Sequence, residues 1–118
     1  MVVILPGLFW ELHEANQTLR SFSDVLFTKQ YTQAYDLTSS ELRTSTDYKT
    51  FVKVHEDLSL RLGDFQSLEV NQSNIKDQSD GWYVRVDARM IFARGSLPFF
   101  FVLKKEDGSW KIYSYHEQ

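Results

Sequence analysis

The chain has 118 residues, a formal net charge of −3 and an aromatic content of 15%, which is high for a globular protein. This length fits one compact domain. The acidic balance, without any basic run, argues against nucleic acid as a partner, and the absence of cysteine from the sequence excludes disulfides, thiolate catalysis and Cys-based metal sites.

The first ten residues, MVVILPGLFW, are apolar but are interrupted by Pro6 and Gly7. They are too short for a bilayer span of about 20 residues, and they lack the basic region and cleavage site of a signal peptide. Three roles stay open for residues 1–10: the lead-in to a helix, the remainder of a membrane anchor, or an arm that binds a partner. We expect one domain at residues 11–118, either in the cytoplasm or outside it behind a membrane anchor.

Helical periodicity extends from about residue 9 to residue 29, where apolar residues follow a 3-4-3-4 spacing. The stripe consists of Leu12, Ala15, Leu19, Phe22 and Leu26. A short helix is expected from about Tyr31 to Thr38. A loop should follow, because the Ser and Thr side chains of TSSELRTST compete for backbone hydrogen bonds. A third helix is expected from an N-cap at Thr46 to about Leu62, just before Gly63.

From Asp64 onward the apolar residues alternate with a period of two, which predicts strands. The clearest strand is WYVRVDARMIF at residues 82–92, others are expected at 97–105 and 110–116, and FQSLEVNQSNI is a weaker one. The polar stretch NQSNIKDQSDG is the plausible flexible segment, and Asp107-Gly108 is a strong hairpin signal. The predicted fold class is α+β, with three N-terminal helices packed on one face of a curved, mainly antiparallel sheet of about four strands.

The order of a long helix, a short helix, AYDLTS and a third helix, before long strands that end in DGSWKIYSY, resembles the nuclear-transport-factor-2-like group, which shares a cone-like fold with ketosteroid isomerase. The resemblance covers roughly residues 11–118, and its most specific part is the final hairpin with Gly108, Trp110, Lys111 and Ile112. It also extends to extracytoplasmic or membrane-anchored members, in which an anchor precedes the domain. Such a fold hosts enzymes, small-ligand binders and scaffolds alike.

The resemblance implies a cavity inside the cone, lined by the helices and by inward strand positions. The expected lining is Phe22, Tyr35, Phe51, Trp82, Val84, Val86, Met90, Phe99, Phe101 and Trp110. Enzymes of the group place a carboxylate base and hydrogen-bond donors there. The alternation puts Ser114 and His116 on the inward side with Trp110. The polar candidates are therefore Tyr35, Asp36, His55 and His116, although both histidines also fit surface positions and Asp36 fits a cap or an exposed site.

Metal and phosphate chemistry lack support in the sequence. His13-Glu14 and His55-Glu56 each begin like the zinc-protease helix motif, but the second histidine is missing from both. The three scattered histidines have no chelating spacing, and the five glycines form no phosphate-binding loop. We expect neither a metal nor a cofactor.

The sheet face away from the helices is expected to carry an apolar and aromatic patch. Its residues are Ile91, Phe100, Val102, Tyr113 and Tyr115, rimmed by Arg85, Arg89 and Lys111. Monomers rarely expose such patches, and aromatic residues with arginine are typical of interface hot spots. We therefore expect a homodimer through this face, which is also a habit of the group that the chain resembles. Alternatively, the curl of the sheet or the N-terminal arm covers the patch.

The leading hypothesis is a non-enzymatic domain that dimerises through its sheet and holds a small apolar ligand between helices and sheet, because the predicted interior has no convergent acid–base pair. One alternative is an isomerase, dehydratase or cyclase acting on an apolar small molecule in that cavity. Another is an extracytoplasmic adaptor domain of a membrane-anchored protein.

Overall fold

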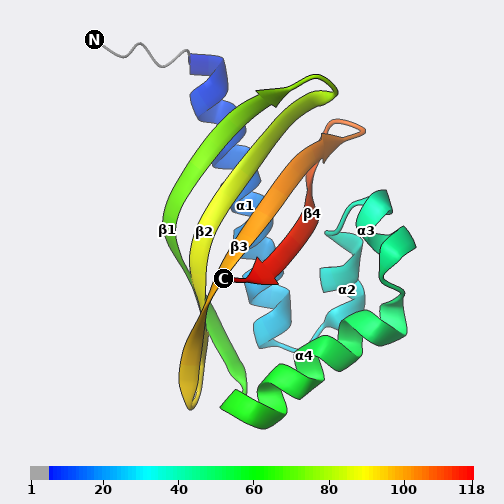
Figure 1. Cartoon of the computed structure of the whole chain (residues 1–118), viewed down its shortest axis with the longest axis vertical. Coiled ribbons are helices and arrows are strands. Elements are labelled where there is room, and N and C mark those ends of the chain that lie inside the picture. Colours follow the sequence, from blue (N-terminus) through cyan, green and yellow to red (C-terminus); the bar gives the residue numbers. More distant parts are fainter. Residues whose placement is uncertain (1–5) are drawn as a thin grey trace.

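Four helices precede four strands in the part of the chain that the computed structural model describes, residues 6–118. The helices are α1 (Pro6–Phe27), α2 (Tyr31–Asp36), α3 (Ser40–Ser45) and α4 (Tyr48–Leu62). The strands are β1 (Phe65–Gln78), β2 (Gly81–Phe92), β3 (Gly95–Glu106) and β4 (Ser109–Glu117). The strands form one antiparallel sheet in the order β1-β2-β3-β4, and the helices pack against it (Figure 1). The predicted α+β class is confirmed.

Helix α1 lies behind the sheet and packs on β1 and β4 (Figure 1). The predicted stripe is its buried side: Ala15, Leu19, Phe22 and Leu26 are at most 3% exposed. We call the sheet face that meets α1 the inner face and the opposite one the outer face. The helix begins earlier than predicted, at Pro6, a residue suited to the first helical turn. Residues 6–10 thus belong to a helix, while residues 1–5, on which the anchor hypothesis depends, lie outside the described part.

The prediction of a loop at residues 38–46 is wrong, because most of this segment forms α3. The Ser39 side chain accepts a hydrogen bond of 3.1 Å from the Leu42 N–H and so caps the helix. Serine is as suitable for an N-cap as for a loop, which explains the error. The N-cap of α4 is Asp47, which accepts from the Thr50 N–H at 2.8 Å and lies one residue after the predicted Thr46.

The connection between α2 and α3 extends the sheet beyond β4. Thr38 forms a parallel bridge with Ile112. The Ser39 N–H donates to the Ile112 carbonyl at 2.8 Å, and the Ile112 N–H donates to the Leu37 carbonyl at 2.9 Å. Both Thr38 and Ser39 are fully buried. This pairing fixes the two short helices against the last strand.

Strand β4 contains one more residue than β3 requires. Leu103 pairs with Ile112, but the next residue of β3, Val102, pairs with Ser114, so Tyr113 is the extra residue of a β-bulge. Because side chains alternate along a strand, one inserted residue reverses the face of every residue that follows it.

The reversal overturns the predicted faces of the last residues. Tyr115 pairs with Phe101 and belongs to the inner face, whereas His116 pairs with Phe100 and belongs to the outer face. The expectation that Ser114 and His116 point inward and Tyr115 outward is therefore wrong.

The end of β1 differs from the prediction, whereas the last hairpin agrees with it. Strand β1 runs to Gln78, so residues 72–78 of the segment expected to be flexible pair with β2. The hairpin at Asp107-Gly108 is present as predicted, with φ of 52° and 81°.

Gly63 joins α4 to the sheet at a point of close approach. Its φ is +85°, and a Cβ at this position would lie 2.8 Å from the Cβ of Ala93. The Arg94 N–H donates to the Leu62 carbonyl at 2.7 Å across the same junction. Only glycine suits both this backbone conformation and this spacing.

We predict that Gly63→Ala lowers the free energy of unfolding by about 3 kcal/mol, from backbone strain plus overpacking against Ala93. Gly108→Ala is the matched control, because Gly108 has a similar φ of +81° and a Cβ added there would meet no heavy atom within 4 Å. Backbone strain alone should cost that variant about 1 kcal/mol. Urea unfolding measures both, and equal losses would show that the contact with Ala93 is unimportant.

Candidate functional site

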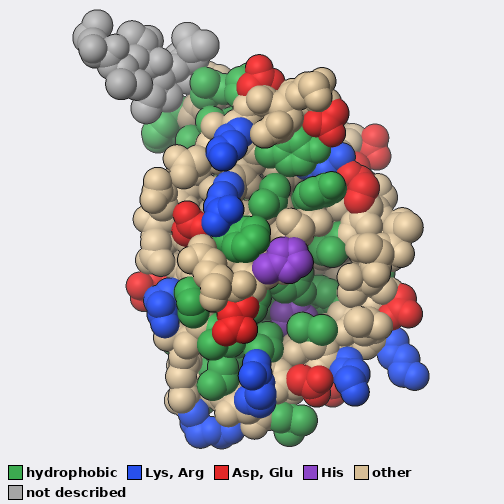
Figure 2. Space-filling view, in the orientation of Figure 1, with side chains coloured by type: hydrophobic (Ala, Val, Ile, Leu, Met, Phe, Trp, Pro, Cys, Tyr) green, Lys and Arg blue, Asp and Glu red, His purple; other side chains and the backbone are tan. Residues whose placement is uncertain are grey.

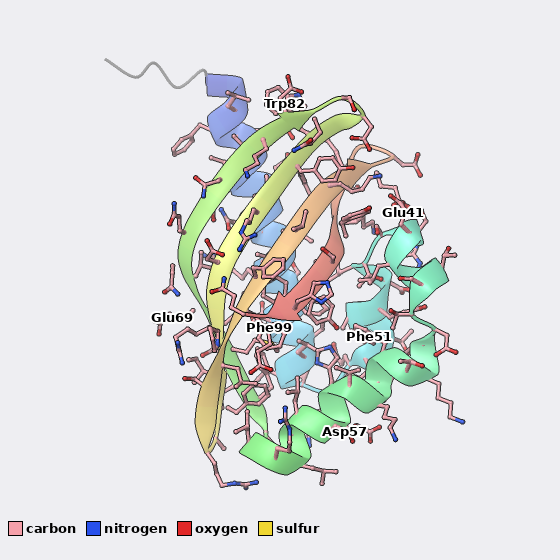
Figure 3. All side chains as sticks on the ribbon, viewed as in Figure 1. Glu41, Phe51, Asp57, Glu69, Trp82 and Phe99 are labelled. Carbon is pink, nitrogen blue, oxygen red and sulfur yellow. The ribbon has the colours of Figure 1, made fainter. Side chains whose placement is uncertain are left out.

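A groove of about 350 Å³ opens between α4 and the ends of β3 and β4. Its lining is Leu42, Thr46, Phe51, Val54, Leu58, Phe99, Ser114, Tyr115, His116 and Glu117. Figure 2 shows hydrophobic and histidine side chains gathered in the middle of this side of the molecule. In Figure 3, Phe51 on α4 and Phe99 on β3 lie on either side of the end of β4. The apolar lining is largely buried, with Phe51, Leu58 and Phe99 at most 6% exposed, whereas Val54 at the rim is 44% exposed.

A partly buried hydrogen bond joins His55 of α4 to Tyr115 of β4. The histidine Nε2 lies 2.7 Å from the tyrosine Oη, and His55 is 5% exposed. The rings of Phe22, Tyr31, Phe51 and Tyr115 surround the imidazole, with centroids 4.8–6.3 Å from its own. The expectation of a surface position for His55 is thus wrong, because the inward turn of Tyr115 supplies the partner that a buried imidazole needs.

Both members of this pair are uncharged near neutral pH. Burial lowers the pKa of His55 to about 4 and raises the pKa of the Tyr115 phenol, because a low-dielectric environment disfavours each charged form. A neutral imidazole can accept the phenol proton or donate its own to the phenol oxygen. In the second case, the Tyr115 O–H is free to donate into the groove. The pair can therefore offer a hydrogen bond to a ligand without carrying a charge.

Glu117 is the carboxylate among the groove residues. Its backbone pairs with that of Phe99, so the bulge places it on the inner-face side of β4, where the strand ends and the side chain is exposed. Sequence alternation missed Glu117 for the same reason that it misplaced Tyr115. It missed Leu42 and Thr46 because their segment was expected to be a loop.

The other polar candidates serve different purposes. The Tyr35 hydroxyl donates to the carbonyl of Thr46 at 2.7 Å and holds α2 to the start of α4. Asp36 is exposed, and its backbone carbonyl accepts from Lys111 Nζ at 3.0 Å. His116 is exposed at the groove rim, with its ring 5.6 Å from that of Phe100. The structure therefore brings His55 and His116 to the groove region but not the side chain of Asp36.

The predicted cavity residues divide into three groups. Phe51 and Phe99 line the groove. Most of the others fill the core between α1 and the sheet with 0% exposure: Phe22, Val84, Val86, Met90 and Phe101. Trp110 is also buried, and its Nε1 donates to Glu11 at 2.8 Å, whereas Trp82 is 42% exposed at the end of β2. The apolar groove thus lies beside α4, and the placement of Trp82 in it is wrong.

The outer sheet face is half-buried by contacts among its own side chains. The Arg85 guanidinium lies 4.3 Å above the Phe100 ring, and Tyr83 and Tyr113 meet edge to face at 5.7 Å. Arg89 donates to Ser96 Oγ at 2.9 Å. A second hollow of about 370 Å³ lies on this face. Its lining is Lys76, Gln78, Asp80, Tyr83, Arg85, Val102 and Tyr113.

Metal-binding clusters and membrane-spanning helices are both absent from residues 6–118. No three histidine, aspartate or glutamate side chains in this part lie close enough together to hold a metal ion. None of the helices in residues 6–118 combines the length and the apolar character that crossing a membrane requires.

Comparison with known proteins finds similarity in structure only. No protein-family model matches the chain, and no curated protein matches it either. The structure of Aln2 from a Streptomyces species superposes with a TM-score of 0.67 at 11% identity, covering 99% of this chain and 93% of Aln2. A protein from Catenulispora acidiphila superposes with a TM-score of 0.68 at 12% identity, covering 95% and 93%. Both are small α+β proteins, and the likeness shows the fold.

We predict that acid destabilises the protein through His55. Its pKa in the folded state, about 4, lies below the ordinary 6.5, so between these values the unfolded state binds more protons and stability falls as the pH falls. From pH 7 to pH 4 the free energy of unfolding should drop by about 3 kcal/mol from this group alone.

Urea unfolding of the wild type and of His55→Gln at both pH values isolates this contribution, because the carboxylates titrate in both proteins. The control is His116→Gln, which removes an exposed histidine and should keep the full pH dependence of the wild type. An unchanged pH dependence in His55→Gln would contradict the prediction.

Proposed function

We propose that the chain is a non-enzymatic binding domain that holds a small, uncharged, mostly apolar molecule in the groove beside α4. The observation that carries this proposal is an apolar groove lining that ends at one uncharged hydrogen-bonding pair, Tyr115 with His55. The volume of the groove, about 350 Å³, lies within the range of small-molecule sites.

We also propose that the domain is nuclear-transport-factor-2-like. The order of helices before strands and the packing of helices against one curved antiparallel sheet support this assignment (Figure 1). A groove between helix and sheet also agrees with the position of the cavity that the resemblance implies. The assignment concerns the fold, and the ligand must be argued from the groove itself.

The groove residues define the chemistry of the ligand. Phe51, Leu58 and Phe99 provide an apolar surface, and the Tyr115 hydroxyl provides one hydrogen bond to a carbonyl or hydroxyl group. The Glu117 carboxylate at the mouth disfavours an anion. A neutral ring system with a single carbonyl oxygen fits these requirements.

An enzyme that moves a proton next to a carbonyl is the second candidate, because Glu117 and Tyr115 line the same groove. Glu117 would accept the proton, and Tyr115 would donate a hydrogen bond to the carbonyl oxygen. We favour binding because the Glu117 side chain is exposed to water rather than enclosed in the groove, and because His55 and Tyr115 stay uncharged.

We predict that 1-tetralone, a neutral bicyclic ketone, binds in the groove with a dissociation constant on the order of 1 mM, as its size allows. NMR titration in D₂O should shift signals of α4 and β4. Val54→Trp should abolish these shifts by filling the groove, whereas Leu60→Trp, also on α4 and 78% exposed, should not.

The same spectra separate the two candidate functions. Binding without deuterium uptake by the ketone beyond the buffer rate is the expected result. Uptake that Glu117→Gln abolishes would favour the enzyme, and equal shifts in the wild type and Val54→Trp would overturn the groove as the site.

We further propose that two copies pair through their outer sheet faces. The face carries Phe100, Val102 and Tyr113 half-buried beside Arg85 and Arg89, a composition typical of interfaces. Four strands about 4.8 Å apart and about ten residues long give roughly 600 Å² per copy, so a pair would bury about 1,200 Å², the lower limit for specific interfaces. Tyr115 is not part of this surface.

We predict that Val102→Glu weakens the dimer at least tenfold, because the added carboxylate would lose its water in the middle of the face, where its neighbour Arg85 already contacts Asp87 and the Phe100 ring. Val70→Glu is the control, since Val70 is 46% exposed and its β1 position pairs with inner-face Ala88. Analytical ultracentrifugation measures both variants. A monomeric wild type, or equal dissociation of the two variants, would contradict this proposal.

A further inference from the structure

Three aromatic side chains stand exposed at one end of the molecule. Phe9 is 65% exposed, Trp10 is 58% exposed and Trp82 is 42% exposed. We call these three residues the aromatic pole. Two of the three tryptophans of the chain belong to it, whereas the third, Trp110, is buried in the core.

An ion pair joins the start of α1 to the end of the sheet that carries Trp82. Glu11, directly after Trp10, accepts from Lys105 Nζ at 2.9 Å. Lys105 follows Lys104, which pairs with Tyr83, the neighbour of Trp82 in β2, so this contact and Trp82 belong to the same end of the sheet. Figure 3 shows Trp82 at the end of the longest axis of the molecule at which α1 also begins.

We propose that the aromatic pole inserts into the interface of an electrically neutral lipid membrane. Tryptophan and other aromatic rings favour the boundary between headgroups and acyl chains, because one part of the ring is apolar and another can hydrogen-bond. The sequence immediately before the pole is Met-Val-Val-Ile-Leu, followed by Pro-Gly-Leu, so the apolar character of this end continues along the chain. The proposal is independent of the ligand groove, which lies beside α4.

The charges around the pole favour a neutral membrane over an anionic one. Glu11 is paired with Lys105, and the pKa of Glu11 is lowered by this contact. Asp80 accepts from the Tyr83 hydroxyl at 2.8 Å, and Lys104 pairs with Glu41. No cluster of unpaired basic side chains in the described part would draw this end to acidic lipids. Insertion should therefore depend on apolar area and only weakly on salt.

Sedimentation with phosphatidylcholine vesicles tests the proposal on the full chain. The wild type should bind, with a shift of tryptophan emission to shorter wavelength. Phe9→Ser combined with Trp10→Ser should reduce the bound fraction at least tenfold, and Trp82→Ser should reduce it about threefold, in proportion to the apolar area removed. Adding phosphatidylserine or about 0.5 M salt should change binding less than twofold.

Phe27→Ser is the matched control, because Phe27 is 59% exposed at the opposite end of α1. It should bind vesicles like the wild type. Thermal unfolding verifies that all variants fold, as the exposure of these side chains leads us to expect.

Any of the following outcomes would overturn the proposal. A wild type that stays in the supernatant excludes insertion, and unchanged binding after replacement of all three pole residues assigns any membrane contact elsewhere. Equal losses in Phe27→Ser and the pole variants would indicate a nonspecific effect of exposed apolar residues. Self-association without vesicles, abolished by the pole substitutions, would identify a second copy as the occupant.

Discussion

A single inserted residue in β4 determines how the interior and the groove are built. Tyr113 has no counterpart in β3, so the strand reverses its faces between Ile112 and Ser114. Tyr115 then turns inward, stacks on Phe101 with ring centroids 5.5 Å apart, and meets the histidine of α4. Without the bulge, that phenol would point away from the helices, and the buried imidazole would lack its partner. The groove, the pair beneath it and the composition of the outer face all follow from this one insertion.

The pair of His55 and Tyr115 is a polar feature in an aromatic surrounding. Burying an imidazole and a phenol costs free energy unless each finds a hydrogen bond, and here each satisfies the other. In the described residues, every fully buried side-chain nitrogen or oxygen atom has such a partner. The shared bond also restricts the rotation of the phenol, so a ligand would meet a hydroxyl held in one position rather than a mobile one. Preorganisation of this kind lowers the entropic cost of binding.

The sequence predicted best those elements in which one side of a regular structure is buried. The stripe of α1 and the alternation of β2 were read correctly, because burial imposes the helical or the strand period on the choice of residues. The bulge left no such pattern: Tyr113 is not a glycine, and its insertion depends on pairing with β3 and on the segment before α3. The position of the groove was also beyond prediction, because it depends on where α4 lies relative to the sheet, and α3 was hidden by the double role of serine in caps and loops.

The pairing of Thr38 with Ile112 has a consequence for contacts between sheets. At that point the last strand has already given its N–H and its carbonyl to a neighbour within the chain. Fibre growth by strand addition needs two free sheet edges on every copy, because each copy must pair with a neighbour on both sides. Here β1 retains an open edge, while the opposite edge is occupied at its middle and lies beside the short helices (Figure 1). The middle of β4 therefore cannot receive a strand from another copy, which leaves the β1 edge as the open side for such pairing.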